Sequence, residues 1–493
     1  MLYTSTRGNG ERVRSTKAVL NGLAKDGGLY MPVKFPEPID YRELCTKSFR
    51  EMAVRIFSCF LDDYPDIDSV VERAYRNKFD TEEITPTVKV GDRYVLELFH
   101  GPTSAFKDVA LSALPVLMTE AQKLENETDE ILILTATSGD TGKAAMEGFR
   151  DVPGIRIVVF YPNGGVSPVQ EKQMTTQEGN NVRAAAVCGN FDDAQTGVKE
   201  IFSRVQKEGL PREAHTVLSS ANSINIGRLV PQIVYYYKGY SDLVKAGVIK
   251  AGEEVDFTVP TGNFGDILAG YFAKKLGLPI RKLICASNEN NVLTDFFDTG
   301  KYDKNRPFFK TSSPSMDILV SSNLERLLYL ACSEDGEYVS SVMRSLKENG
   351  FYEIPEEMRE EILKSFDAGF SDTVEAASAI KSVYEKTGYL MDPHTAVAYH
   401  VADNFIEEEE SLGIPNIVLS TASPYKFPKD VLNALGIVAG NDPFEVMDQL
   451  NAATHVPVPD NLKGLRERPV RFRDVVLKED LYDYVIKEVL HVS

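Results

Sequence analysis

The stretch ILILTATSGDTGKAAMEGF, residues 131–149, decides the fold. ILILTAT predicts a buried strand, and TGKAAMEGFR, which begins inside the stretch, predicts a helix. The turn SGDTG joins them, and ligands of α/β sheets bind at such carboxyl ends of strands, where the next helix begins. Its hydroxyls and free backbone N–H groups would suit a carboxylate or a phosphate, although Ser138 and Asp140 are also common helix caps.

The same alternation of strands and helices extends outward from this stretch. The sequence predicts helices at 106–124, 141–150, 167–177, 192–209 and 267–277, and strands at 92–100, 155–162, 182–189, 254–260, 281–288 and 416–422. The strand at 416–422 is expected to be the last, and the segment 322–386 is expected to be helical and charged. Because short strands alternate with helices, we expect parallel sheets in an α/β architecture.

We expect three structural units, because 493 residues exceed one ordinary core. Residues 1–90 predict a mostly helical N-terminal domain, with amphipathic stretches at 13–25 and 51–64. Residues 91–125 and 251–493 predict a large α/β domain, and residues 126–250 predict a small one.

Composition excludes several classes of function. The chain has 54 Lys and Arg against 73 Asp and Glu, a net charge of −19, which disfavours nucleic acid and anionic lipid as main partners. The five cysteines form no C-x-x-C pair and the six histidines show no metal-ligand spacing, so we expect neither disulfides nor a metal site. The charged start MLYTSTRGNGERVRS does not resemble a signal peptide, so we expect a cytoplasmic protein.

A second turn, TGNFGD at residues 261–266, also lies between a predicted strand and a predicted helix. The glycines would let the backbone approach a phosphate closely and form a nest of N–H groups. The same residues also fit an ordinary glycine-rich turn, and the pattern alone leaves both interpretations open.

Two basic residues begin predicted helices. In HGPTSAFKDVALSALP, Lys107 is either a surface lysine whose stem covers apolar residues or a partly desolvated amine that could form an imine with an aldehyde. In SSANSINIGRLVPQ, Arg228 follows the polar residues Asn222, Ser223 and Asn225. Its guanidinium would suit a phosphate, although a surface arginine on an amphipathic helix fits the spacing equally well.

Taken together, the motifs resemble one family. ELFHGPTSAFKD, TATSGDTGKAA, ANSINIGRL, PTGNFGD and MDPHTAVA, with KAVLNGLAKDGGLYMP near the start, look like threonine synthase of the longer class with an extra N-terminal domain. The resemblance extends from near residue 3 to about residue 430. It implies a pyridoxal-phosphate enzyme of fold type II, related to the tryptophan synthase β subunit, with two parallel-sheet α/β domains and a mostly helical N-terminal domain.

The resemblance also implies roles for individual residues. Lys107 would carry pyridoxal 5'-phosphate and act as the catalytic base. The other residues implied to contact the cofactor are Asp140, Gly262, Asn263, Phe264, Gly265 and Thr421. The residues implied to bind the substrate are Ser138, Gly139, Thr141, Ser223, Asn225 and Arg228. The implied reaction converts O-phospho-L-homoserine and water into L-threonine and phosphate, in a monomer or homodimer without a metal.

The sequence departs from the commonest family pattern at two places. Asp140 stands where many relatives have Asn, and Ser423-Pro424 stands where the family often has His-Pro, which leaves open the role of that loop and of Lys426. Serine or threonine dehydratases and phosphoamino-acid phospholyases share the lysine and the glycine-rich loop, and a non-catalytic relative would share the fold. His100 and His394 could line the site, with capping or packing as the simpler role.

Overall fold

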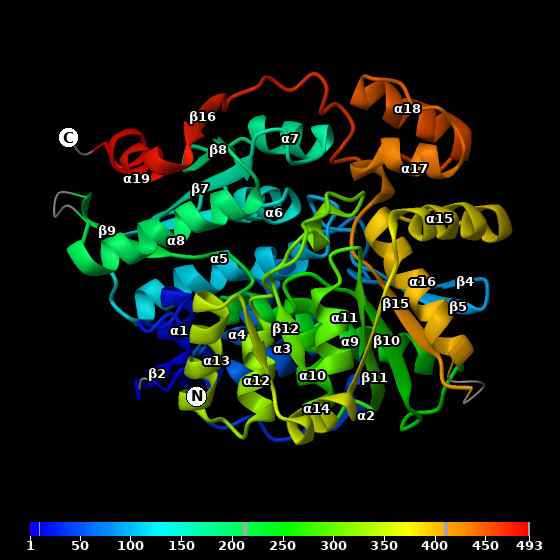
Figure 1. Cartoon of the computed structure of the whole chain (residues 1–493), viewed down its shortest axis with the longest axis horizontal. Helices are drawn as coiled ribbons and strands as arrows, with labels where there is room; N and C mark the ends of the chain where they lie inside the picture. Colours follow the sequence, from blue (N-terminus) through cyan, green and yellow to red (C-terminus); the bar gives the residue numbers. More distant parts are fainter. Residues whose placement is uncertain (9, 211–213, 409–412, 492–493) are drawn as a thin grey trace.

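The computed structural model describes residues 1–8, 10–210, 214–408 and 413–491. A smaller sheet lies above a larger one, and the N-terminal unit packs below and to the side (Figure 1). The predicted α/β architecture with two mainly parallel sheets is confirmed.

The larger sheet has the strand order β14-β11-β10-β15-β5-β4, and all neighbours are parallel except β4 and β5. Every residue of β10 and β15 is buried, so helices and loops cover both faces of the sheet. The strands are β4 (Thr87–Val90), β5 (Arg93–Glu97), β10 (Val255–Pro260), β11 (Ile280–Ser287), β14 (Phe366–Phe370) and β15 (Asn416–Ser420). Helices packed on it or on one another are α5 (Lys107–Leu124), α9 (Ile226–Lys245), α10 (Gly265–Lys275), α11 (Val292–Thr299), α15 (Thr373–Thr387) and α16 (Pro393–Glu408).

The smaller sheet is fully parallel in the order β16-β8-β7-β6-β9. Along β6, Ile131 and Ile133 join the main core while Leu132 and Leu134 join a second core, because successive side chains point to opposite faces. The elements are β6 (Glu130–Ala136), α6 (Asp140–Gly148), β7 (Ile155–Pro162), α7 (Pro168–Thr175), β8 (Val182–Cys188), α8 (Phe191–Glu208), β9 (Thr216–Ser219), β16 (Asp474–Leu477) and α19 (Leu481–Tyr484).

The N-terminal unit is not only helical. Its first strands form the antiparallel sheet β2-β1-β3, which the sequence did not predict because the strands are only two to four residues long. Ser48 and Glu51 form a capping box at the start of α3, and the apolar face of that helix packs against α9. The elements are β1 (Leu2–Ser5), β2 (Val13–Arg14), α1 (Ser15–Asn21), β3 (Tyr30–Pro32), α2 (Tyr41–Leu44), α3 (Phe49–Phe60) and α4 (Ile67–Tyr75).

Strand pairing assigns some segments to other structural units than those predicted from the sequence. The sequence predicts that residues 251–493 complete the large domain and that 416–422 is the last strand, but β16 follows and pairs with β8 of the smaller sheet. β16 is short and mostly exposed, so it has no apolar signal in the sequence. β4 pairs in the larger sheet although residues 1–90 were grouped as N-terminal, and α9, which we grouped with the small domain, packs against α5 and α10.

The segment predicted to be wholly helical, 322–386, also contains strands. β14 completes the larger sheet, and β13 (Phe351–Glu353) pairs with β12 (Lys301–Asp303). The helices of this segment before α15 are α12 (Leu324–Ala331), α13 (Gly336–Glu348) and α14 (Glu356–Leu363).

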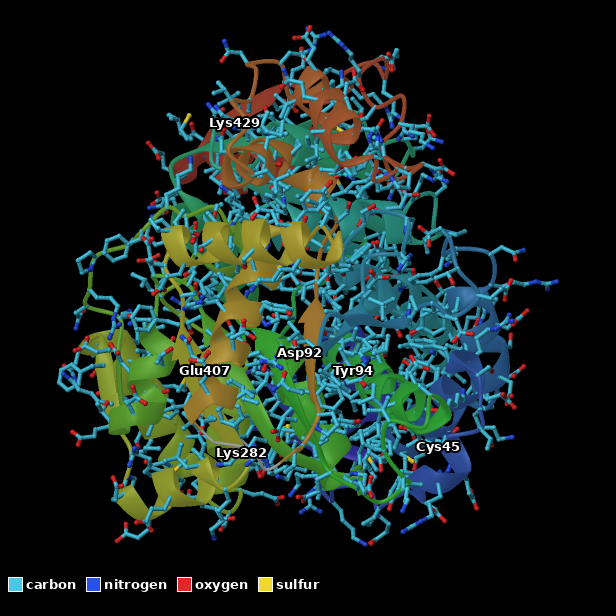
Figure 2. All side chains as sticks on the ribbon, turned by 90° about the vertical axis from the view of Figure 1, so that its right-hand side faces the viewer. Cys45, Asp92, Tyr94, Lys282, Glu407 and Lys429 are labelled. Carbon is cyan, nitrogen blue, oxygen red and sulfur yellow. The ribbon has the colours of Figure 1, made fainter. Side chains whose placement is uncertain are left out.

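The chain finishes across the top of the molecule. Lys429 lies with the upper layer of helices α17 (Pro428–Ala434) and α18 (Pro443–Thr454) (Figure 2). Tyr94 and Lys282 mark strands β5 and β11 of the larger sheet, and Cys45 marks the N-terminal unit. Among the residues described, no helix combines the length and apolar character needed to cross a membrane.

Candidate active site

A pocket with about 630 Å³ of empty space, part of it open to solvent, lies where β6, β10 and β15 end. Its lining brings together most of the residues predicted from the motifs: Lys107, Asp140, Thr141, Ser223, Arg228, Gly262, Asn263, Phe264, Gly265 and Thr421. The predicted residues Ser138, Gly139 and Asn225 are not part of this lining.

Lys107 is buried at the first position of α5 and is not a surface residue. The backbone N–H of Phe106 donates to the carbonyl of Thr421 (2.8 Å), which fixes the loop before the helix. The Lys107 Nζ lies 4.6 Å from the centre of the Phe106 ring and 3.8 Å from Asp140 Oδ2. Burial disfavours the ammonium and lowers the pKa of Lys107 to about 8, although Asp140 opposes the change. A considerable fraction of this amine is therefore neutral near pH 8.

Asp140 forms a buried ion pair with Lys426. The Lys426 Nζ lies 2.5 Å from Asp140 Oδ1 and also donates to the carbonyl of Thr103 (3.1 Å), while Gln170 Nε2 donates to the same carboxylate (2.8 Å). Burial alone would raise the pKa of Asp140, but the charges of Lys426 and Lys107 outweigh it and hold that pKa well below its usual range. Asp140 is therefore a fixed anion between two lysines.

The Ser423-Pro424 turn explains how Lys426 reaches this position. The Ser423 Oγ accepts a hydrogen bond from the backbone N–H of Tyr425 and starts the short helix η3 (Pro424–Lys426). The backbone N–H of Ser423 donates to the carbonyl of Ser104 (3.1 Å), which ties the turn to the loop before Lys107. The turn therefore places the cation that neutralises Asp140.

The glycine-rich turn forms a concave backbone at the start of α10. Phe264 has the left-handed φ of 62°, unusual for a non-glycine residue. A Cβ on Gly262 would lie 2.7 Å from the carbonyl oxygen of Ser315, so only glycine fits there. The first N–H groups of α10 have no partner inside the helix, and the turn can therefore hold a phosphate.

Asp266 lines the same pocket. Sequence reasoning missed it because an acidic residue in the first turn of a helix is common. Its Oδ1 accepts hydrogen bonds from the hydroxyls of Tyr235 (2.5 Å) and Tyr236 (2.9 Å). Within the described residues its Oδ2 has no partner. Burial raises the pKa of Asp266 to about 6.

Arg228 is buried with an unused donor. Its Nη1 donates to the carbonyl of Ala221 (3.0 Å), but its Nε has no hydrogen-bond partner in the described part of the chain. Burial lowers the pKa of Arg228 to about 10 because the charged form is desolvated. A buried cation with an unpaired donor is unfavourable unless an anion binds it. The residue therefore fits an anionic ligand.

The Asn225 side chain makes hydrogen bonds to protein groups, and its part in substrate binding stays a prediction. Its Oδ1 accepts from the backbone N–H of Gly227 (2.9 Å) and so caps α9. Its Nδ2 donates to the carbonyls of Val19 (2.9 Å) and Ser220 (3.0 Å). The side chain is thus committed to protein groups behind the pocket.

Ser138 and Gly139 belong to a turn that Thr137 organises. The Thr137 Oγ1 accepts from the backbone N–H groups of Gly139 (2.9 Å) and Gly142 (2.8 Å). Gly139 has a φ of 129°, and a Cβ there would lie within 2.5 Å of the Gln170 side chain. The sequence motif suggested the turn but not the contribution of Thr137.

Of the two histidines considered, only His394 lines the pocket. Its Nδ1 is 2.7 Å from Asp392 Oδ1, and its Nε2 accepts from the backbone N–H of Ser315 (3.2 Å), which fixes the ring. His100 lies between Asp80 and Glu97, outside the lining. Among the described residues, no cluster of His, Cys, Asp or Glu side chains is arranged to hold a metal ion.

Comparisons with known proteins show the family to which the chain belongs. Three family models match the chain: Threonine synthase N terminus at residues 2–75, Pyridoxal-phosphate dependent enzyme at 82–419, and Threonine synthase, C-terminal, at 395–485. Threonine synthase of Saccharomyces cerevisiae is 40% identical over 88% of this chain and 89% of its own length. Human Threonine synthase-like 1 is 41% identical over 87% of this chain, and the chain spans only 58% of that protein.

Solved structures show the same relationship. The crystal structure of threonine synthase from yeast matches with a TM-score of 0.87 and 35% identity, covering 99% of both chains. A PLP-bound threonine synthase from Brucella melitensis matches with a TM-score of 0.85 and 39% identity, covering 98% of both. The predicted fold type II is confirmed, and the chain belongs to the threonine synthase family of pyridoxal-phosphate-dependent enzymes.

Proposed function

We propose that this protein converts O-phospho-L-homoserine and water into L-threonine and phosphate. The observation that carries the proposal is a single pocket with a buried lysine amine, a concave glycine-rich turn and a buried arginine with an unused donor. A pyridoxal-phosphate enzyme that releases phosphate needs each of these three elements.

The residues present fit pyridoxal 5'-phosphate. The turn Gly262–Gly265 would hold its phosphate, and Lys107 would bind its aldehyde. Asp140 would lie beside the ring hydroxyl, and Thr421 would contact the ring nitrogen. When bound, the cofactor supplies an electron sink for the carbanion formed at the substrate's Cα.

Lys107 would move the protons. Its pKa of about 8 allows the amine to accept a proton near neutral pH and to return it later. The Asp140–Lys426 pair supplies a fixed carboxylate 3.8 Å from the amine without leaving an uncompensated negative charge. A neutral Thr421 hydroxyl at the ring nitrogen would leave the cofactor ring less electron-withdrawing than a carboxylate partner would, which suits chemistry that extends outward to Cβ and Cγ.

Arg228 and Ser223 would hold the phosphate of the substrate. The departing group is an anion, and the chain as a whole carries a net charge of −19. Local positive charge must therefore come from Arg228 and from helix N-termini. Thr141 would contribute to the carboxylate site, with Ser138 and Gly139 shaping that turn.

We further propose a cytoplasmic enzyme that acts as a monomer or homodimer on this small-molecule substrate. Sedimentation of the purified protein and fractionation of cells would test these two statements.

The decisive assay supplies O-phospho-L-homoserine and follows phosphate, threonine and ammonia together. Equal amounts of phosphate and threonine are expected, and ammonia in place of threonine would identify a lyase of the dehydratase or phospholyase type. Lys107→Ala should lose both turnover and the visible absorbance of the lysine-bound cofactor. Turnover retained in Lys107→Ala would contradict the proposal.

A further inference from the structure

Residues 220–228, called the substrate loop, comprise the turn before α9 and the first turn of that helix, and they carry Ser223 and Arg228. Both residues line the pocket, and the buried Nε of Arg228 has no hydrogen-bond partner among the described residues. On the rear side the Asn225 Nδ2 donates to the carbonyl of Val19, and the Ser219 Oγ just before the loop donates to the carbonyl of Leu20 (2.6 Å). The C-terminal turn of α1 is therefore part of the wall behind the substrate loop.

Arg326 forms the other part of this wall. It is completely buried on α12, and its Nη2 donates to the carbonyl of Ile224 (2.6 Å), inside the substrate loop. Its Nε donates to the carbonyl of Tyr30 (3.2 Å) in strand β3 of the N-terminal unit. One guanidinium thus joins the substrate loop to the N-terminal unit.

Asn323, one turn earlier, connects this wall to both anion-binding loops. Its Oδ1 accepts from Arg326 Nη1, and its Nδ2 donates to Ser223 Oγ (3.2 Å) and to the carbonyl of Asn263 (3.1 Å). The backbone N–H of Asn323 also donates to the carbonyl of Asn263 (3.0 Å). Asn323 is completely buried and is absent from the pocket lining, so it acts through the residues that it holds.

The start of the chain fixes α12 from outside. Thr6 Oγ1 donates to Glu325 Oε1 (2.6 Å), and Arg7 donates to both carboxylate oxygens through Nε (3.0 Å) and Nη2 (2.9 Å). Bidentate pairing of this kind restrains orientation as well as distance. Glu325 lies between Asn323 and Arg326 in sequence. The start of α12 therefore carries both the residue that pairs with the N-terminal unit and the two residues that contact the substrate loop.

We infer that Asn323 is a positioning residue. It sets the distance between the glycine-rich turn 262–265 and the substrate loop 220–228, and Arg326 and the N-terminal unit hold it in place. A phosphate-releasing reaction needs this spacing, because both anions must bind in one small pocket at the same time. The inference rests on the proposed roles of Ser223, Arg228 and the turn 262–265.

The test measures binding of inorganic phosphate to the holoenzyme by calorimetry, since the cofactor then occupies its own turn. Asn323→Ala and Ser223→Ala should each weaken phosphate binding about tenfold. If the two effects were independent, the double variant would bind phosphate about 100-fold more weakly than the wild type. We expect a much smaller loss of affinity, because the two side chains act through one hydrogen bond. In turnover, Asn323→Ala should raise KM for O-phospho-L-homoserine more than it lowers kcat.

Asn181→Ala is a matched control. Asn181 Nδ2 also donates to buried carbonyls, those of Phe149 (2.8 Å) and Ile155 (2.8 Å), but the residue lies outside the pocket lining. Its replacement should lower Tm and leave phosphate affinity within about twofold. If Asn323→Ala does not fold, Asn323→Asp retains the volume and the acceptor for Arg326 but removes both donors, and it should weaken phosphate binding as well.

Unchanged phosphate affinity in a folded Asn323 variant, or full additivity with Ser223→Ala, would overturn the inference. A wild-type holoenzyme that binds phosphate but does not release it from O-phospho-L-homoserine would overturn the proposed function instead, and the phosphate titration would still decide the role of Asn323.

Discussion

Two buried arginines lie at the substrate loop, Arg228 within it and Arg326 behind it on α12, and they differ in how many hydrogen bonds they donate. Burial lowers the pKa of both Arg228 and Arg326 to about 10. Arg326 donates to two carbonyls and to Asn323, whereas Arg228 donates to one carbonyl and keeps an unused Nε in the described structure. The two arginines are equally buried but differ in their hydrogen bonds. This difference indicates that Arg326 is a structural cation and that Arg228 binds a ligand.

The largest expected effect is on stability, at the rear. Arg326→Met should reduce the free energy of unfolding by about 3–5 kcal/mol, because it leaves the buried carbonyls of Tyr30 and Ile224 without donors. Denaturant titration would measure this loss. An Arg326→Met variant as stable as the wild type would contradict the structural role of Arg326.

At the front the expected effect is on substrate binding. Arg228→Met should raise KM for O-phospho-L-homoserine by about 30- to 150-fold, equivalent to about 2–3 kcal/mol, since a charged hydrogen bond to phosphate is lost. Its free energy of unfolding should be unchanged or higher by about 1 kcal/mol, because a desolvated charge is removed. Cofactor absorbance should persist, and its loss would place Arg228 in the cofactor site instead.

A smaller effect concerns the pH dependence of Lys107. The positive charge of Arg228 contributes to the lowered pKa of Lys107, after the larger effect of burial. The amine reacts when it is neutral, so imine formation between the apoenzyme and pyridoxal should increase as pH rises through about 8. In Arg228→Met the midpoint should move to higher pH by less than about one unit. In a folded Arg326→Met variant the pH midpoint of imine formation should not change. Equal changes of this midpoint in the two variants would show that the charge of Arg228 has no specific effect on Lys107.

The smallest expected effect is at the outer anchor. Glu325→Gln should lower the free energy of unfolding by about 1 kcal/mol, because Arg7 is partly exposed and solvent screens the pair. Phosphate affinity should fall slightly in the same variant if α12 transmits the restraint to Asn323. Thermal unfolding and phosphate calorimetry on one sample would give both values.

The sequence predicted the elements whose signal is local. The strand-turn-helix units around 131–149 and 254–277 have apolar runs and glycine-rich turns, and both are found as β6-α6 and β10-α10. Lys107 was assigned through its motif, since spacing alone also fitted a surface lysine. The structure shows that Lys107 is buried, and burial lowers the pKa of its amine to about 8.

The sequence did not predict the roles of several polar residues, because those roles depend on contacts with residues far away in the chain. The hydrogen bond of Asn225 to the carbonyl of Val19 could not be predicted because the two residues are 206 positions apart. The role of Lys426 stays open in the sequence because it depends on Asp140, which begins the distant helix α6. Thr137, Asp266 and Asn323 belong to ordinary polar contexts in the sequence and become notable only once the loops are brought together.

Strand β16 has a consequence for folding during synthesis. β8 gains its outer neighbour only after residue 477 has left the ribosome, when the other strands of the smaller sheet have long been made. Until then β8 is an open sheet edge that could pair with another chain. Shortening the chain before residue 474 should therefore promote aggregation of the nascent protein while the pocket residues remain intact in sequence.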